Sequence, residues 1–462
     1  MSMLFKERSL RKGESPTSAL LNKWPRSSDR MRGPWQPEES TVRGILKLST
    51  LSRQHKIRCA VLQCFSNPFP EQLSMHLRDL TGREWRSLLR WLDVSGLALY
   101  LLDQLSELQL SHIFPAPILT RLQQNMLDNT RRTRSMLQES TAIQREFQER
   151  NLSYAVLKGA SLYPESVPRL ELRHQFDLDF LIAQGSVTEG RQVLERQGYR
   201  LYAVSGASWE FKKDEQIGVS MEDFYKDTSG RTVELHVQPQ GEGGASVLSR
   251  VETRQLYGID MPVLSPIDLF LGQAMHAYKH ICGEFSRTAH LLEFYRHVGI
   301  RRDDDLFWSE LRAKGAGDPK LSLGLGVVTL LISTVMGDFA PHALTEWTVD
   351  RLSPTVRLWI NLHGPRTVFG DVPGNKLYLL LQREIEPANP ATSRRLIQAL
   401  LPRRLPPLVV RAANGESLST RARRYRVQLF YALLRLRFHV VEGARYGLEA
   451  HRWSKLRKDY TR

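Results

Sequence analysis

The sequence contains little cysteine and no long uninterrupted hydrophobic run. Its three cysteines are Cys59, Cys64 and Cys282, and no two of them are spaced as Cys-x-x-Cys. A disulfide framework is therefore excluded, and we expect a reducing compartment, the cytoplasm. The most apolar stretch, residues 321–336, contains serine and threonine and falls short of the ~18 apolar residues that indicate a transmembrane helix. We expect it to form a buried helix, with neither a transmembrane segment nor a secretory leader elsewhere.

The composition excludes two further classes of protein. Hydrophobic residues make up 41% of the chain and charged residues 25%, which excludes a wholly disordered protein. The 30 glycines and 23 prolines follow no period, which excludes a collagen-like fold. A chain of 462 residues is long enough for two or three packed units, or for one catalytic domain with large helical additions.

The net charge of +16 is concentrated at the two ends of the chain. Residues 1–60 contribute +8 and residues 391–462 contribute +13, so residues 61–390 sum to −5. Arginines in the last segment alternate with apolar residues such as Leu433 and Leu436, which predicts a basic amphipathic helix. Such a helix could bind an anionic partner, either RNA or a membrane surface, or it could pack its apolar face against the acidic body.

Changes in hydrophobic periodicity predict five segments. Thr81 and Glu84 form a capping box at the start of one helix, and Ser265 followed by Pro266 marks the start of another. Strand-like alternation is confined to the middle of the chain. The expected segments are a flexible basic arm (1–50), a helical region (51–151), an αβ core (152–240), a helical domain (241–390) and a basic Arg-rich helical tail (391–462).

Asp177 and Asp179 are candidate metal ligands. They lie in the alternating run Phe176-Asp-Leu-Asp-Phe-Leu-Ile182, which predicts a strand. Residues i and i+2 of a strand project from the same face, about 6–7 Å apart, so the two carboxylates point together. Neighbouring carboxylates in a sheet resist ionisation unless a cation compensates them, and Mg²⁺ would do so.

Two other segments carry groups that suit the same chemistry. Lys158 and Gly159 follow a short apolar strand, where a glycine lets the backbone approach a phosphate closely. Glu234 lies on a later strand, Val233-Glu-Leu-His236, and supplies a third carboxylate. Three acids on neighbouring strands beside a strand-glycine turn describe a two-metal phosphoryl-transfer site.

These residues, in this order, resemble a known family. The run Val156-Leu-Lys-Gly-Ala-Ser-Leu162, Arg173, the Asp177–Asp179 strand, and Val233-Glu-Leu-His236 are similar to the uncharacterised nucleotidyltransferase family of the DNA polymerase β-like nucleotidyltransferase superfamily. The resemblance covers roughly residues 80–335. It implies an α+β fold: a polymerase β-like core with a small mixed sheet and helices, flanked by N- and C-terminal helical regions.

The resemblance also implies an activity: an acceptor attacks the α-phosphate of a nucleoside triphosphate and pyrophosphate leaves. Asp177, Asp179 and Glu234 would then be the catalytic residues and would hold two Mg²⁺ ions. Lys158, Gly159 and Ser161 would bind the nucleotide. Ser161 is included as a substitute phosphate donor, because Ala160 occupies the position where the superfamily usually has Gly or Ser. Arg173 and His236 would be accessory residues. The acceptor is a small molecule or a protein side chain.

Each candidate also has a plainer interpretation. An Asp-x-Asp pair on a strand is often a solvated edge feature, and a histidine such as His236 is often a hydrogen-bonded core residue. His276 and His280 share a helix face at a spacing that can bind zinc, but the sequence shows no clear third ligand, which favours packing.

Two hypotheses of function follow. The first is a Mg²⁺-dependent nucleotidyltransferase, favoured because all three acids are present. The alternative is a non-catalytic protein of the same fold that binds RNA or an anionic membrane through its basic ends. A template-directed polymerase is disfavoured because the residues around the acids lack the interleaved aromatic and basic side chains of a nucleic-acid track.

Overall fold

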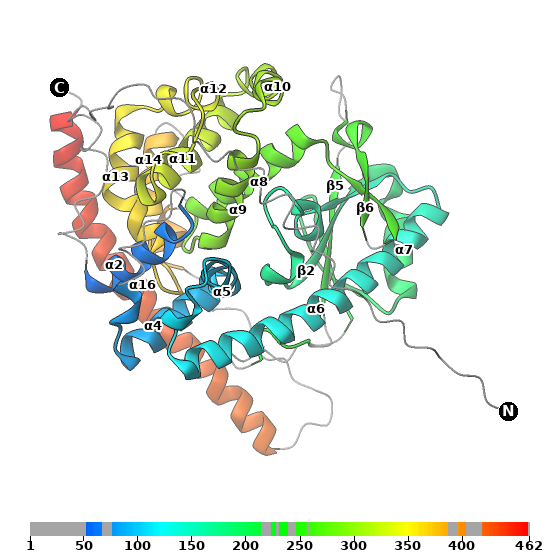
Figure 1. Ribbon diagram of the computed structural model, residues 1–462, viewed down its shortest axis with the longest axis horizontal. Helices are drawn as coiled ribbons and strands as arrows, with labels where there is room; N and C mark the ends of the chain where they lie inside the picture. Colours follow the sequence, from blue (N-terminus) through cyan, green and yellow to red (C-terminus); the bar gives the residue numbers. More distant parts are fainter. Residues whose placement is uncertain are drawn as a thin grey trace. The chain divides into compact units, whose positions relative to one another are not determined.

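The structure is a computed structural model, and Figure 1 shows its elements. It describes residues 52–66, 76–213, 223–227, 231–238, 246–256, 258–386, 396–402 and 418–460. These residues all belong to one compact unit, Ile45–Arg462. The basic arm expected over residues 1–50 lies outside the described residues.

A mixed seven-stranded sheet forms the centre of the αβ part, in the order β3-β4-β5-β2-β1-β7-β6. The β2·β5 and β1·β7 pairs are parallel, and the other neighbours are antiparallel. The strands are β1 (Tyr154–Leu157), β2 (Asp177–Ala183), β3 (Arg200–Ser205), β4 (Ser208–Lys212), β5 (Thr232–Gln238), β6 (Glu252–Leu256) and β7 (Ile259–Val263). The sheet and its helices confirm the α+β fold class.

The sheet extends beyond the core expected over residues 152–240. β6 and β7 lie after that boundary, and β7 pairs with β1 through Val156 and Val263. Residues 252–263, which were expected in the helical domain 241–390, therefore contribute two strands to the sheet. The division into separate domains stays a prediction, because the described residues form one compact unit.

Alternation along β2 places its acids on one face of the sheet. Leu178, Phe180 and Ile182 join a buried core with residues of α6 (Ala116–Glu149) and α7 (Val187–Arg196). Phe147 of α6 makes an edge contact with Phe180, with ring centroids 5.6 Å apart. Since side chains alternate along a strand, Asp177 and Asp179 project from the opposite face.

Helix α6 links the helical region to the sheet. It has 34 residues, a length of about 51 Å, and Figure 1 shows it running from α5 (Ala98–Glu107) along the sheet. Near its middle, Asn129 donates to the carbonyl of Glu171 and Arg132 donates to the carbonyl of Gln175. These bonds fix the loop that leads into β2.

The remaining helices bury the largest core. The capping box expected at Thr81 is present at the start of α4, where the Thr81 and Glu84 side chains each bond the other's backbone. The other α-helices are α2 (Arg53–Gln63), α4 (Gly82–Ser95), α8 (Pro266–Ile281), α9 (Thr288–Ile300), α10 (Asp305–Gly315), α11 (Pro319–Met336), α12 (His342–Thr345), α13 (Pro354–Val368), α14 (Tyr378–Ile385) and α16 (Leu418–Tyr460). Short 3-10 helices are η3 (Ser111–Ile113), η4 (Gly159–Leu162), η5 (Leu170–Leu172), η6 (Gln184–Ser186), η7 (Val247–Arg250) and η8 (Val349–Arg351).

The apolar stretch forms α11, as expected. Among the described helices, α11 is the one long and apolar enough to cross a membrane by length and composition. More than half of it, 56%, is buried against neighbouring helices, which is also what the core helix of a soluble protein shows. Leu325, Val328 and Leu331 are fully buried there.

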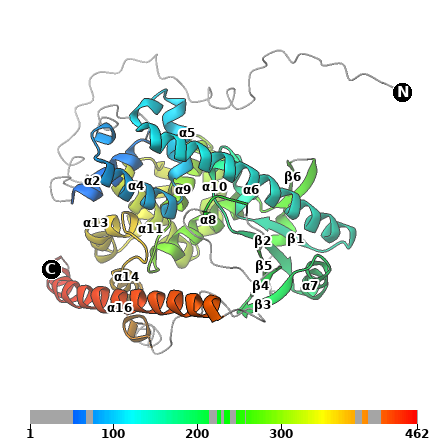
Figure 2. The ribbon, with the colours of Figure 1, turned by 90° about the horizontal axis from the view of Figure 1, so that it is seen from below.

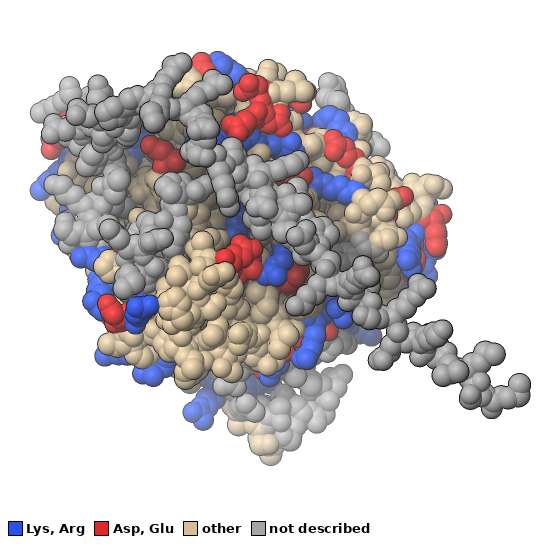
Figure 3. Space-filling model, viewed as in Figure 1, with Lys and Arg blue, Asp and Glu red and all other residues tan. Residues whose placement is uncertain are grey.

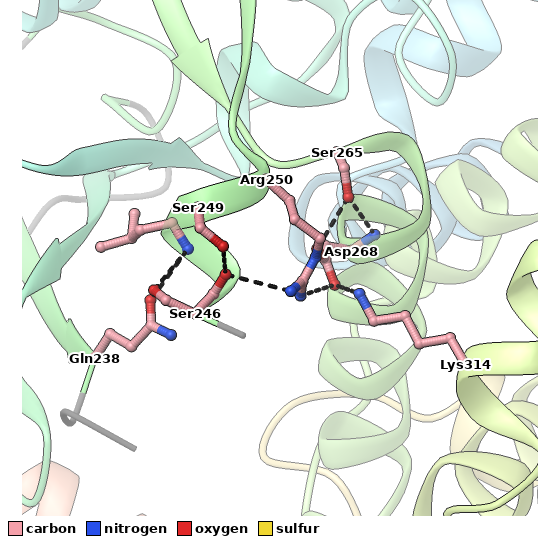
Figure 4. A network of polar contacts seen from close by, with 8 residues as sticks. Gln238, Ser246, Ser249, Arg250, Ser265, Asp268 and Lys314 are labelled. Carbon is pink, nitrogen blue, oxygen red and sulfur yellow. Dashed lines mark hydrogen bonds and ion pairs between the residues drawn. The ribbon is translucent and has the colours of Figure 1, made fainter. Parts of the chain in front are cut away.

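A polar network fixes the start of α8 against the sheet (Figure 4). Ser265 caps α8, as expected, and its hydroxyl also donates to Asp268 at 2.9 Å. Arg250, the last residue of η7 between β5 and β6, donates to both carboxylate oxygens of Asp268 at 3.0 and 3.3 Å. Lys314 of α10 also pairs with Asp268. Burial acts to raise the pKa of Asp268, but these hydrogen bonds outweigh burial and lower it. Asp268 therefore remains ionised and holds three elements together.

Helix α16 carries most of the basic tail and lies beside α14 in Figure 2. Arg435 of α16 pairs with Glu284 at 3.1 Å, and Trp453 donates to Glu384 of α14 at 3.0 Å. Its exposed large apolar residues are Leu418, Tyr425, Val427, Leu429, Phe430, Leu433, Leu434, Leu436, Val440, Val441, Leu448 and Leu456. The helix thus docks on the body and leaves much of its apolar surface exposed.

Candidate active site

The pairing of β2 with β5 brings acidic side chains together. In this parallel register Asp179 lies opposite Glu234. Aligned residues of neighbouring strands share a face, and so do residues i and i+2, so Glu234 and His236 project beside Asp179. One ligand atom from each of Asp179, Glu234 and His236 lies within 4.8 Å of the others. Asp177 lies on the same face, two residues earlier, outside this group.

Asp179 is the centre of the polar contacts. It is 4% exposed, and its Oδ1 accepts from Lys158 Nζ at 2.7 Å and from His236 Nε2 at 3.0 Å. His236 Nε2 also lies 3.4 Å from Glu234 Oε2. The sequence left open whether Lys158 points to solvent, and in the structure its ammonium group lies against Asp179.

The three carboxylates differ in their readiness to ionise. Burial and the neighbouring charge of Asp179 raise the pKa of Asp177. Burial, Asp179 and Asp177 raise the pKa of Glu234 in the same way. Burial also acts to raise the pKa of Asp179, but hydrogen bonds from His236 and Lys158 outweigh burial and lower it. Burial likewise opposes the charge of Lys158, but Asp179 raises its pKa, so both groups stay charged.

This donor set fits a divalent cation. Carboxylate oxygens are the ligands that Mg²⁺ prefers, and raised carboxylate pKa values indicate repulsion that a cation would relieve. Asp179 and Glu234 could hold such an ion, with Asp177 at its edge. The site could then polarise phosphoryl oxygens.

The turn after β1 has a backbone conformation that favours glycine. Lys158 and Gly159 both have positive φ, +50° and +46°. A Cβ atom on Gly159 would lie 2.5 Å from Gln175 Oε1, so the Gln175 side chain would have to shift. The glycine therefore leaves room for the Gln175 side chain, which comes from the loop before β2.

Ser161 lies in the turn after β1. It is fully buried, and its hydroxyl donates to the carbonyl of Lys158 at 2.8 Å. In this structure the hydroxyl therefore closes the turn, and the nucleotide contact expected of Ser161 stays a prediction.

Arg173 is a buried support of the site. It is 8% exposed, pairs with Glu293 of α9 at 3.0 Å, and donates to Gln175 Oε1 at 3.0 Å. Tyr100 donates to the same Glu293 oxygen at 3.1 Å. Arg173 therefore positions Gln175 over the Gly159 turn, from inside the protein.

Sequence reasoning missed two residues that border the site. Glu210 of β4 lies opposite Glu234 in the antiparallel β4·β5 register and pairs with Lys212 at 2.8 Å. The alternation Trp209-Glu-Phe-Lys212 was the available signal, since it places Glu210 on the polar face of its strand. Gln175 gave no sequence signal, because its role depends on the crossing of two loops.

Carboxylates on adjacent strands beside a strand-glycine turn are the arrangement of a metal-dependent phosphoryl-transfer site. The chain belongs to the family described as uncharacterised nucleotidyltransferase, which matches residues 81–337, more than half of the sequence. It is accordingly a nucleotidyltransferase, and the expected family is confirmed.

Solved structures with similarity to this chain are distant from it. The crystal structure of ANT(2")-Ia in complex with adenylyl-2"-tobramycin is 12% identical, with a TM-score of 0.29, over 39% of this chain and 98% of that one. An antigenic nucleotidyltransferase-like protein from Paracoccidioides brasiliensis is 15% identical, with a TM-score of 0.25, over 45% of this chain and 94% of that one. No curated protein matches the sequence.

Proposed function

We propose that this nucleotidyltransferase is Mg²⁺-dependent and transfers a nucleoside monophosphate from a nucleoside triphosphate to a small-molecule or protein acceptor, releasing pyrophosphate. The observation that supports this most directly is the convergence of Asp179, Glu234 and His236 on one face of the sheet. Mg²⁺ bound there would neutralise charge on the triphosphate as the α-phosphate is attacked.

Each residue has a part in this proposal. Asp179 and Glu234 hold the metal, and Asp177 completes the two-ion site at the start of β2. Glu234, whose pKa is raised, could accept the proton of the acceptor. Lys158 keeps its charge beside Asp179 and is placed to contact the triphosphate when a metal takes over that carboxylate. Gly159 keeps the turn free of side-chain atoms.

Nucleotide turnover with matched variants tests this function. The full chain is incubated with Mg²⁺ and each of the four nucleoside triphosphates, and pyrophosphate release is measured with protein and with cell extract as acceptors. Asp179→Asn and Glu234→Gln should each reduce the rate by 100-fold or more, on the order of a lost transition-state contact. The control Asp303→Asn changes an exposed carboxylate in the turn before α10 and should leave the rate unchanged. Undiminished release in Asp179→Asn would refute the assignment.

A second candidate function is the binding of an anionic partner by the basic tail. A cavity of about 1200 Å³ lies between α16 and the body, and seven arginines line it against three acids. The arginines are Arg58, Arg90, Arg366, Arg435, Arg437, Arg445 and Arg452. On the face shown in Figure 3, by contrast, Lys and Arg are interspersed with Asp and Glu among the described residues. The cavity thus supports an anionic partner for residues 391–462, either RNA or an acidic membrane.

The two functions separate in one experiment. Charge reversal at Arg437, which is exposed at the cavity, should weaken salt-dependent binding to RNA or anionic vesicles and leave nucleotide turnover intact. Arg302→Glu, at an exposed site after α9, is the control. Binding without turnover in the wild-type protein would favour the non-catalytic alternative.

We also propose a reducing compartment, the cytoplasm, as the site of action. Cys59 and Cys64 are free and buried, and burial raises the pKa of their thiols to about 11 and about 12. Buried neutral thiols are unreactive, and they are compatible with a compartment where disulfides do not form.

A further inference from the structure

Three histidines converge on a second cluster, separate from the acidic one. His276 and His280 lie one turn apart on α8, and His290 faces them from α9. Their ring centroids are 4.6 to 4.9 Å apart. One ring nitrogen from each lies within 4.8 Å of the other two. The third ligand that the sequence did not show is therefore His290, brought in by the turn between the two helices.

The three rings are half-buried or buried between α8 and α9, and neutral imidazole is the form that binds metals. Neutral imidazoles packed together need hydrogen bonds or a shared cation to satisfy their lone pairs.

Two observations on these rings support a ligand at the cluster. His290 is 7% exposed, and its Nδ1 is buried with no hydrogen-bond partner among the described residues. The His280 ring forms a hydrogen bond with the backbone of Phe285, in which a protonated ring nitrogen of His280 is the donor. Metal-ligating histidines commonly donate one N–H to a backbone carbonyl, which fixes the tautomer and directs the other lone pair to the metal.

We propose that His276, His280 and His290 bind one Zn²⁺ ion, with water as the fourth ligand. Zinc takes imidazole nitrogens at about 2.0–2.1 Å in tetrahedral geometry, which puts ligand nitrogens about 3.3 Å apart. The ring nitrogens lie within 4.8 Å of one another, so the most distant pair would approach by about 1.5 Å to reach this spacing. Mg²⁺ and Ca²⁺ are poor candidates because they prefer oxygen ligands. The ion would join α8 to α9.

The proposal does not depend on the nucleotidyltransferase chemistry, but the acidic cluster could also take zinc. Asp179, Glu234 and His236 offer two carboxylates and one imidazole. Excess Mg²⁺ occupies carboxylate sites and leaves histidine sites free, so it separates the two clusters. The test is therefore carried out in excess Mg²⁺.

The experiment measures zinc binding to the full chain without a histidine tag. Protein stripped with a chelator is titrated with Zn²⁺ against a chromophoric competitor, and Co²⁺ is used as a spectroscopic probe of four-coordinate geometry. We expect one zinc per chain, a Co²⁺ spectrum typical of tetrahedral sites, and a rise in melting temperature on zinc addition. His276→Gln and His280→Gln should each weaken zinc affinity roughly 10–100-fold or more. The rise in melting temperature should disappear with the affinity.

Two controls make the result decisive. His342→Gln changes an exposed histidine on α12 and should bind zinc as the wild type does. Asp179→Asn should also keep the site. Circular dichroism of each zinc-free variant shows whether it is folded, and a variant that fails to fold is replaced by the other α8 variant. The proposal is overturned if wild-type protein takes up no zinc in excess Mg²⁺, or if Asp179→Asn removes the zinc while His276→Gln retains it.

Discussion

Removal of the negative charge of Glu293 should strongly destabilise the protein. Glu293 is 2% exposed and pairs with Arg173 at 3.0 Å. The negative charge of Glu293 also acts to raise the pKa values of Arg287 and Arg296, which burial lowers. The Glu293 carboxylate therefore pairs with one buried guanidinium group, that of Arg173, and helps to compensate two half-buried ones, so Glu293→Gln would remove charge compensation from all three.

The size of the effect follows from the geometry. Two unit charges 3.0 Å apart attract by about 5 kcal/mol at an effective dielectric constant of about 20. Removal of one partner of a buried pair costs about 3–5 kcal/mol in measured cases. We expect Glu293→Gln to lower the free energy of unfolding by that amount. Arg173→Met should cost less, because Glu293 then keeps Arg287 and Arg296. Tyr100→Phe, which removes one hydrogen bond, should cost about 1 kcal/mol.

Urea unfolding followed by circular dichroism measures these differences. Glu310→Gln, at an exposed position on α10, is the control and should change the unfolding free energy by less than about 0.5 kcal/mol. The reasoning is refuted if Glu293→Gln is no more destabilising than the control, or if Arg173→Met is the more destabilising of the two charge-removing variants.

Two further variants test the turn and the buried histidines. Gly159→Ala should abolish nucleotide turnover and lower the free energy of unfolding by about 1–2 kcal/mol, because the new Cβ would collide with Gln175 and φ at this position is +46°. The control Gly185→Ala, where a Cβ would meet open space, should change neither turnover nor stability. Equal activity in the two variants would contradict this account. His297 is fully buried, and burial lowers its pKa to about 3, so on acidification the unfolded chain binds a proton at this residue before the folded protein does. The stabilising contribution of the neutral His297 is therefore complete above pH 6.5. As the pH falls towards 3, this contribution is lost at about 1.4 kcal/mol per pH unit. Urea midpoints of His297→Gln should therefore decline less between pH 6.5 and 5 than those of wild type, whereas His342→Gln should decline as the wild type does; parallel declines in all three would show that His297 is not responsible.

The strand that carries Asp177 and Asp179 could be predicted from the sequence because its information is local. A period-2 alternation fixes which face Asp177 and Asp179 share, and the same rule applies to Glu234 and His236. The register that places Asp179 opposite Glu234 is not local, and the sequence did not predict it. β-sheet order depends on which strands pair, and pairing is set by packing between distant segments.

The supporting residues could not be predicted for the same reason. Gln175 acquires its role from the crossing of two loops, and Glu293 acquires its role from a helix more than a hundred residues after Arg173. The third histidine of the α8–α9 cluster likewise required the packing of two helices. The hydrogen bond from the Ser161 hydroxyl to the carbonyl of Lys158 could not be predicted either, because a strand-to-helix turn can use a serine either to bind a ligand or to bond its own backbone, and the sequence does not distinguish the two.

The α8–α9 pair connects the two clusters and explains why the helices after the sheet matter to the site. Asp268 fixes the start of α8 to η7, which lies between β5 and β6, and Leu269 packs on the core that contains Leu181 of β2. Glu293 of α9 holds Arg173, which holds the loop entering β2. A zinc ion between α8 and α9 would restrain both supports at once. Zinc should therefore slow hydrogen exchange in the loop before β2 as well as in the two helices, and exchange that slows in the helices alone would show that the clusters are mechanically separate.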